Sequence, residues 1–464
     1  MTLPFASAVD RTLERLRKAF RETAAGAREV VGAALRADLP DDDLPRLKTR
    51  IDACLTGKGG ETARRGRAAD LGQTYLSLSA AGKTKFLLTL AHDYGLSRAA
   101  ALETVTQWRA SNQNLRSLRR ALEPPAVRLL HEFVGVPQGV KFVVDLRAEL
   151  LALGSDDAAA RMLGEDLRPL LGAWFDVSFL DLVRIDWQAP AALLERLVAY
   201  EAVHAIRSWR DLKNRLDSDR RCFAFFHPRM PDEPLIFVEV ALVDGLADNV
   251  QSLLDAGAET SDPHQANTAI FYSISNCQQG LAGISFGNFL IKRVADQLAR
   301  ELPNIKEFAT LSPLPGLRRY IETRLRAEGD AALTPAETVK LVTLGTRTGA
   351  AATLTALLAT SRWWEQTAVE KIIGPIVLRM AARYLTTVDE EGKTGDRVAH
   401  FHLGNGAIVE RINWLADTSS NGMQQAYGVM VNYRYKLSAV DANHEAYASG
   451  KVITSRAVRS LAAG

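Results

Sequence analysis

The first part of the chain carries the apolar spacing of amphipathic helices. Residues 9–20 place an apolar side chain at every third or fourth position, with charged residues between, and this repeat predicts a helix with one buried face. The same spacing returns over residues 44–55, after three aspartates that suit the positive amino-terminal end of a helix. Further helices are predicted over residues 83–94, 115–122, 126–133 and 140–153. Because no strand-like alternation interrupts them, we predict a helical bundle.

After about residue 175 the pattern changes to short runs of β-branched and apolar residues, which are typical of buried strands. The predicted strands are Leu235–Val243, Thr268–Ser275, Phe308–Leu311 and Tyr427–Tyr435. A helix is predicted between two of them, over residues 289–301. Strands interleaved with helices indicate a mixed α/β domain. We therefore predict two domains, a helical one over residues 1–172 and an α/β one over residues 173–464.

Composition and charge narrow the class of protein. The 464 residues are 47% hydrophobic and 24% charged, which is the composition of a globular protein and excludes a disordered or fibrous chain. Lys and Arg number 57 against 54 Asp and Glu, a net charge of +3. With no long basic run, neither nucleic acid nor an anionic membrane surface is an expected partner.

The sequence also indicates the cellular compartment in which the protein is expected. No apolar stretch reaches the roughly 18 to 20 residues that a membrane-spanning helix needs, and the first 20 residues are too charged for a secretory signal. Cys54, Cys222 and Cys277 form no CxxC pair, which favours free thiols in a reducing compartment. We expect a cytoplasmic protein.

Two segments suggest phosphate binding, and one of them is misleading. Residues 81–84 (Ala-Gly-Lys-Thr) resemble the end of a Walker loop, but Ser77 stands where the motif needs glycine and the surroundings are helical. The segment Thr268–Arg293 instead runs from a strand through a loop with Gly280, Gly283 and Gly287 into a helix. Such a loop presents free N–H groups to a pyrophosphate, although three glycines alone are more typical of an ordinary loop.

Several ordered motifs together resemble the malonyl-CoA decarboxylase family over nearly the whole chain. They are Arg220–Phe223 (RRCF), Ser273–Gly283 (SISNCQQGLAG), Gly287–Val294 (GNFLIKRV), Leu311–Gly316 (LSPLPG), Phe401–Ala407 (FHLGNGA), Arg411–Trp414 (RINW) and Met430–Tyr435 (MVNYRY). The resemblance implies a helical amino-terminal domain used in assembly, followed by an acetyltransferase-like (GNAT-like) catalytic domain. It also implies homotetramers built as dimers of dimers.

The resemblance implies a binding site for CoA in the loop after the fourth core strand. Its expected residues are Ala282, Gly283, Ile284, Ser285, Phe286, Gly287 and Asn288, together with Ser312 and His402. Gly287 takes the place of the last glycine in the acetyltransferase turn. Ser285 stands where the first glycine would be, and Ala282 replaces the usual Arg or Gln, so the individual amide contacts differ from that pattern.

The expected chemistry needs few groups. Loss of CO₂ from malonyl-CoA leaves a thioester enolate, which requires donors to its oxygen and an acid to protonate its carbon. The thioester carbonyl is itself the electron sink, so no biotin or other organic cofactor is expected. His400 and His402 would share one face if they lay on a strand, but no further ligands complete a metal site.

The resemblance assigns the proton donor to His402 and the proton acceptor to Ser312. From the residues alone, His402 is more typical of a loop histidine beside the turn at Asn405, and Ser312 before Pro313 is a common helix N-cap. Polarisation of the carboxylate or thioester is a further possible role for the serine. Tyr433 and Tyr435 share one face of a strand, where a phenol can orient His402 or simply pack in the core.

Two other functions remain open at this point. A CoA-dependent acyltransferase would use the same fold and CoA site with an amine acceptor, for which the sequence shows no groove. A non-enzymatic CoA-binding assembly protein would bind without turnover.

Overall fold

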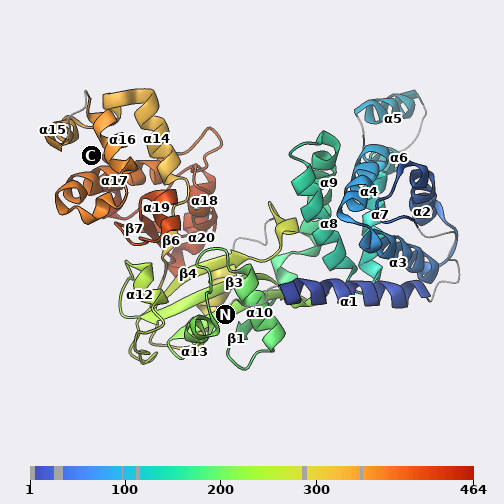
Figure 1. Cartoon of the computed structure of the whole chain (residues 1–464), viewed down its shortest axis with the longest axis horizontal. Helices are drawn as coiled ribbons and strands as arrows, with labels where there is room; N and C mark the ends of the chain where they lie inside the picture. Colours follow the sequence, from blue (N-terminus) through green and yellow to red (C-terminus); the bar gives the residue numbers. More distant parts are fainter. Residues whose placement is uncertain are drawn as a thin grey trace.

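The helical repeats of the first part of the chain fold as predicted in a computed structural model, which describes residues 6–25, 35–96, 98–110, 115–284, 290–344 and 349–463. The helices pack around one another at one end of the molecule (Figure 1). They are α1 (Ala6–Ala25), α2 (Leu44–Thr56), α3 (Glu61–Ser77), α4 (Ala80–Tyr94), α5 (Arg98–Ala110), α6 (Leu115–Ala121), α7 (Pro125–His131), α8 (Gly139–Leu153) and α9 (Ala158–Trp174).

The rest of the chain builds one mixed sheet, in the order β1-β2-β3-β4-β5-β8-β6, with β7 also paired to β8. The four predicted strands are confirmed, in β3, β4, β5 and β8, and four more were missed. The strands are β1 (Asp181–Ile185), β2 (Arg220–His227), β3 (Met230–Val243), β4 (Thr268–Asn276), β5 (Glu307–Thr310), β6 (Ser312–Pro313), β7 (Ile408–Asn413) and β8 (Met430–Arg434).

Helices cover the sheet and its far edge (Figure 1). In β2, Cys222 and Ala224 face α10 and α11, whereas Phe223 and Phe225 belong to the core that includes α13, so both faces of this strand are buried. The helices are α10 (Ala191–Tyr200), α11 (Trp209–Arg215), α12 (Val250–Leu254), α13 (Leu290–Glu301), α14 (Leu317–Glu328), α15 (Pro335–Leu344), α16 (Ala350–Ala359), α17 (Thr367–Thr386), α18 (Arg397–Gly404), α19 (Ser420–Ala426), α20 (Val440–Ala448) and α21 (Arg456–Ala463).

Strands β4 and β5 separate along their length. They pair in parallel only from Thr268 to Phe271 on β4, although β4 continues to Asn276. The chain after β5 turns instead toward β8, where Ser312 pairs with Val431. The separation leaves room between the carboxyl ends of two parallel strands, the usual place for a ligand in such sheets.

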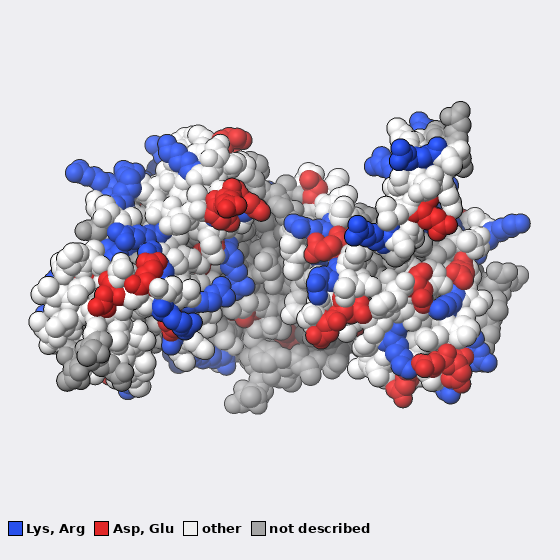
Figure 2. All heavy atoms as spheres, turned by 90° about the horizontal axis from the view of Figure 1, so that it is seen from above, with Lys and Arg blue, Asp and Glu red and all other residues white. Residues whose placement is uncertain are grey.

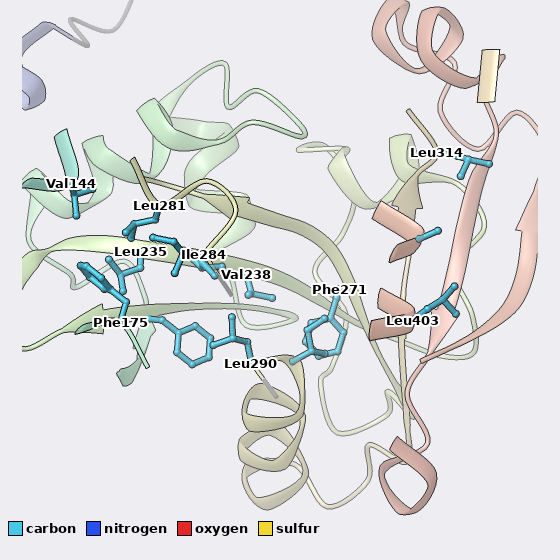
Figure 3. Packing of buried hydrophobic residues seen from close by; sticks show 14 of the residues in the cluster. Val144, Phe175, Leu235, Val238, Phe271, Leu281, Ile284, Leu290, Leu314 and Leu403 are labelled. Atoms are coloured by element: carbon cyan, nitrogen blue, oxygen red, sulfur yellow. The ribbon is translucent and has the colours of Figure 1, made fainter. Parts of the chain in front are cut away.

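The helical part and the sheet share one hydrophobic core. Val144 on α8, Phe175 after α9, Leu235 on β3 and Leu281 after β4 belong to the same buried cluster, and Figure 3 shows Val144 beside Leu281 and Leu235. The predicted helical part followed by an α/β part is thus confirmed as a fold class, while the domain boundary at residue 172 stays a prediction.

Several smaller expectations are tested here. Residues 81–84 lie in α4, where Ser79 caps the helix by accepting from the N–H of Gly82, so the Walker-like segment is a helix start. Cys54, Cys222 and Cys277 are buried free thiols. Among the described helices, none is long and apolar enough to cross a membrane. Acidic and basic side chains are interspersed on the face shown in Figure 2.

Candidate active site

A cavity of about 460 Å³ opens where β4 and β5 separate. Its walls come from β4, from β6, from one face of α18 and from the segments at residues 202–204 and 417–430. Both Ser312 and His402 line it, although they are 90 residues apart in the chain. The fold therefore brings the two predicted catalytic side chains into one cavity.

His402 sits on α18 with both ring nitrogens hydrogen-bonded. Its Nε2 lies 2.9 Å from the Oγ of Ser312, and its Nδ1 lies 2.8 Å from the hydroxyl of Tyr435. The side chain is buried. His400 points elsewhere and bonds through Nδ1 to Tyr447 at 2.8 Å. The segment is a helix and not a strand, so the idea that both histidines share a face is wrong.

The hydrogen-bond network assigns the tautomer of His402. The Tyr435 hydroxyl contacts no acceptor other than Nδ1 among the described residues, so it donates to Nδ1. Nε2 then carries the ring proton and donates to Ser312, whose hydroxyl donates onward to Oγ1 of Thr310 at 2.9 Å. The neutral imidazole thus directs an N–H toward the cavity side of the network.

Burial controls the charges in the site. Desolvation lowers the pKa of His402 to about 3, which favours the neutral ring. Desolvation also raises the pKa of Tyr435 well above its usual range, so this phenol keeps its proton. The ring of Tyr433 stacks on His402 with centroids 4.6 Å apart and planes 24° apart. Tyr433 thus packs against the imidazole, and Tyr435 is the tyrosine that bonds to it.

Ser312 does not cap a helix. It belongs to β6, and the next helix, α14, begins at Leu317 with Gly316 as its N-cap. The position of α18 is instead linked to the turn after Ser312 by the buried carboxylate of Asp396. That side chain accepts from the backbone of Val398 and Ala399 in α18 and from the N–H of Gly316, at 2.9, 3.0 and 3.1 Å.

The predicted CoA loop is described as far as Ile284. Ile284 is buried, whereas Ala282 and Gly283 are exposed. Gly283 has φ +73°, a conformation that favours glycine, and its N–H has no acceptor among the described residues. The other predicted loop residues lie outside the described part of the chain: Ser285, Phe286, Gly287 and Asn288.

Sequence reasoning missed three residues of this region. Thr310 receives the hydrogen bond of Ser312, Asp396 joins α18 to the turn after β6, and Arg147 of α8 contacts the predicted CoA loop. Only Asp396 carried a local signal, because an aspartate just before a helix is a preferred N-cap. The other two contacts depend on tertiary structure.

A family profile described as the malonyl-CoA decarboxylase C-terminal domain matches residues 178–464. This chain belongs to the malonyl-CoA decarboxylase family. The profile of the N-terminal domain of that family matches residues 94–175. The membership expected from the ordered motifs is thereby confirmed.

Members of the malonyl-CoA decarboxylase family align with most of the chain. The mitochondrial malonyl-CoA decarboxylase of Anser anser anser is 35% identical over 409 residues, which are 83% of this chain and 81% of the relative. That of Rattus norvegicus is 34% identical over 421 residues, 86% and 85% of the two chains. The family resemblance therefore extends across both the helical and the α/β parts.

Solved structures of the family share the fold. The malonyl-CoA decarboxylase of Rhodopseudomonas palustris has a TM-score of 0.81 and 39% identity, covering 90% of this chain and 99% of its own. That of Agrobacterium vitis has a TM-score of 0.79 and 40% identity, with the same coverage. These likenesses support the arrangement of the helices and the sheet described above.

The bond between Tyr435 and His402 leads to a prediction. Tyr435→Phe removes the donor that holds the proton on Nε2, and we expect kcat to fall about tenfold, the effect of one lost hydrogen bond of roughly 1.4 kcal/mol. The KM for the acyl-CoA should change little. Steady-state kinetics measures both, with Tyr447→Phe, which removes the bond to His400, as the control. An equal fall in kcat in Tyr435→Phe and Tyr447→Phe would contradict a specific role for Tyr435.

Proposed function

We propose that this protein decarboxylates malonyl-CoA to acetyl-CoA and CO₂. The observation that carries the proposal is the buried line of hydrogen bonds from Tyr435 through His402 to Ser312, which ends at the cavity between β4 and β5. Family membership supports the same reaction. The proposed catalytic residues are His402 and Ser312, with Tyr435 and Tyr433 positioning the imidazole.

His402 supplies the proton. The reaction consumes one proton, because the bond between Cα and the carboxylate breaks, CO₂ leaves, and the enolate carbon gains hydrogen. A malonyl carboxylate inside the cavity raises the pKa of the nearby imidazole, since opposite charges stabilise each other. Binding of the substrate therefore favours uptake of a proton by the imidazole, and the imidazolium donates it to the α-carbon.

Ser312 acts on the developing oxyanion. Its hydroxyl lies 2.9 Å from both Nε2 of His402 and Oγ1 of Thr310, so a small rotation transfers its donated bond from Thr310 to a substrate oxygen. A donor aimed at the thioester oxygen stabilises the enolate in a site that excludes bulk water. This role needs no biotin or other organic cofactor, because the thioester accepts the electron pair left by CO₂.

The exposed turn at Gly283 is the proposed CoA pyrophosphate site, and it leads to a prediction. Gly283→Val should raise the KM for malonyl-CoA more than it lowers kcat, because the side chain strains a positive φ and crowds the phosphates. Gly245→Val is the matched control, since Gly245 has φ +75° and an added Cβ there meets nothing within 4 Å. A similar KM in both variants would place the phosphates elsewhere. Gly287 lies outside the described residues.

We also propose assembly as a homotetramer. Helix α5 has no buried residue in the single chain, and Leu102 on α5 and Leu115 on α6 are 60% and 70% exposed. Exposed apolar side chains on neighbouring helices are typical of subunit contacts. Leu102→Glu should give smaller assemblies, measured by light scattering during gel filtration, whereas Val339→Glu on α15 serves as an exposed control. An unchanged tetramer would remove α5 from the interface.

The compartment stays a prediction. The curated relatives carry the word mitochondrial in their names, and the cytoplasmic location proposed for this chain rests on its sequence alone. Fractionation of cells that express the protein would test it.

The test of the proposed reaction is turnover of malonyl-CoA by the purified protein with no acceptor present. Acetyl-CoA formed under these conditions supports a decarboxylase. Free CoA released only after an amine is added would indicate an acyltransferase, and binding without turnover would indicate a non-enzymatic CoA-binding protein.

A further inference from the structure

Arg147 of helix α8 forms hydrogen bonds with the loop after β4, which packs against this helix. Its Nη1 donates to the carbonyl oxygens of Gly280 and Ala282 at 2.6 and 3.0 Å, and its Nε donates to the carbonyl oxygen of Gly164 at 2.8 Å. The loop residues lie 133 and 135 positions further along the chain. A side chain of the helical part therefore holds the loop that we propose for CoA.

Arg147 is buried, and no carboxylate among the described residues pairs with its charge. Arg147 is 1% exposed and forms no ion pair with a described residue. A buried guanidinium is costly unless its N–H groups are satisfied, and here three backbone carbonyls accept from Nε and Nη1. Burial lowers the pKa of Arg147 from its usual value. An apolar side chain at this position would have a lower desolvation cost, but it would lack the two hydrogen bonds to the loop.

The loop also fits closely against α8. A Cβ added to Gly280 would lie 1.7 Å from the carbonyl oxygen of Val144, so Gly280 permits contact with the helix and does not itself face a phosphate. Leu281 and Ile284 are buried in the same core as Val144 (Figure 3). The loop is thus fixed on one side by packing and by Arg147, and within residues 280–284 Ala282 and Gly283 are exposed.

The contact with Ala282 determines where one peptide N–H points. In a trans peptide the C=O and the following N–H point in opposite directions. Because the carbonyl of Ala282 points at Arg147, the N–H of Gly283 points away from Arg147, and it has no acceptor among the described residues. The positive guanidinium behind the carbonyl also polarises this peptide, which strengthens its N–H as a donor to an anion.

We infer that Arg147 is a positioning residue for the CoA phosphates, through which the helical part of the chain contributes directly to substrate binding. The inference rests on the proposed function, and it adds a role for the helices beyond assembly. Arg147 touches neither the thioester nor the catalytic pair, so it affects the phosphates of the substrate and not the bond that breaks.

The test compares two substrates in the full-length protein. Arg147→Met should raise the KM for malonyl-CoA at least tenfold while kcat stays within a factor of two or three. Malonyl-pantetheine carries the same thioester without phosphates, and the variant should process it at the parent's kcat/KM. Arg147→Lys keeps the charge but cannot reproduce all three bonds, and it should give a smaller rise in KM. Arg229→Met is the control, because Arg229 donates to Val134 across the same boundary, away from the loop.

Three outcomes would overturn the inference. The first is an unchanged KM for malonyl-CoA in Arg147→Met. The second is an equal loss of kcat/KM with malonyl-CoA and malonyl-pantetheine. The third is an equal rise in KM for malonyl-CoA in the control, Arg229→Met. If both Arg147 variants fail to fold, hydrogen exchange in the parent decides, because bound CoA should slow exchange in residues 278–284 and no slowing would overturn the inference. Calorimetry with CoA separates this inference from the reaction: a parent that binds CoA but does not turn over malonyl-CoA refutes the proposed reaction alone.

Discussion

His402→Ala is expected to lower kcat for malonyl-CoA by at least about 100-fold, the lower end of what a positioned general acid contributes. The imidazole bonds to both Ser312 and Tyr435, and the enolate left by CO₂ requires a proton at carbon. Binding of CoA should be retained, because Ala282, Gly283 and Ile284 of the proposed phosphate loop do not line the cavity that holds the imidazole. Steady-state kinetics and calorimetry with CoA measure the two effects.

His400→Ala is the matched control for this variant. His400 lies on the same helix, but its ring bonds to Tyr447 and does not contact Ser312. The control should keep kcat within about threefold of the parent, while His402→Ala should not. Near-parental kcat in His402→Ala would remove this residue from the mechanism.

Ser312→Ala is expected to lower kcat about 100-fold, comparable to the loss of one oxyanion donor in other enzymes. The hydroxyl is buried beside His402, and no other described hydroxyl bonds to that imidazole at Nε2. The KM should change less than kcat, because the bond to the oxyanion forms only as charge develops. Rates at saturating malonyl-CoA measure the effect.

Ser273→Ala controls for the loss of a buried serine hydroxyl on the sheet. Ser273 bonds to Glu201 and does not line the cavity, so its variant should retain kcat. A lower melting temperature in Ser312→Ala without a fall in kcat would show that the serine is structural.

Local sequence patterns were sufficient for much of the fold. The helical spacing over residues 9–20 and 44–55 predicted α1 and α2 because each helix buries one face. The run Leu235–Val243 predicted β3 because a strand buried on both faces is continuously apolar. By contrast, β1 and β7 were missed, since short strands with polar positions that are exposed or half-buried carry little periodicity.

The geometry of the site could not be predicted from the sequence, because it depends on contacts between residues far apart in the chain. The helix that carries His402 has only eight residues, and its partners Ser312 and Tyr435 are 90 and 33 positions away. Their contact is produced by the pairing of β6 with β8 and by the carboxylate of Asp396. The motifs predicted which side chains to examine, whereas the tautomer of His402 and the loop contact of Arg147 follow only from tertiary contacts.

The central claim is that this protein decarboxylates malonyl-CoA by itself. The most direct measurement incubates the purified protein with malonyl-CoA alone and quantifies acetyl-CoA and released CO₂ in the same sample. We predict that the two products appear in a 1:1 ratio and that His402→Ala forms neither at a comparable rate. Intact malonyl-CoA after incubation with folded protein that binds CoA would contradict the account.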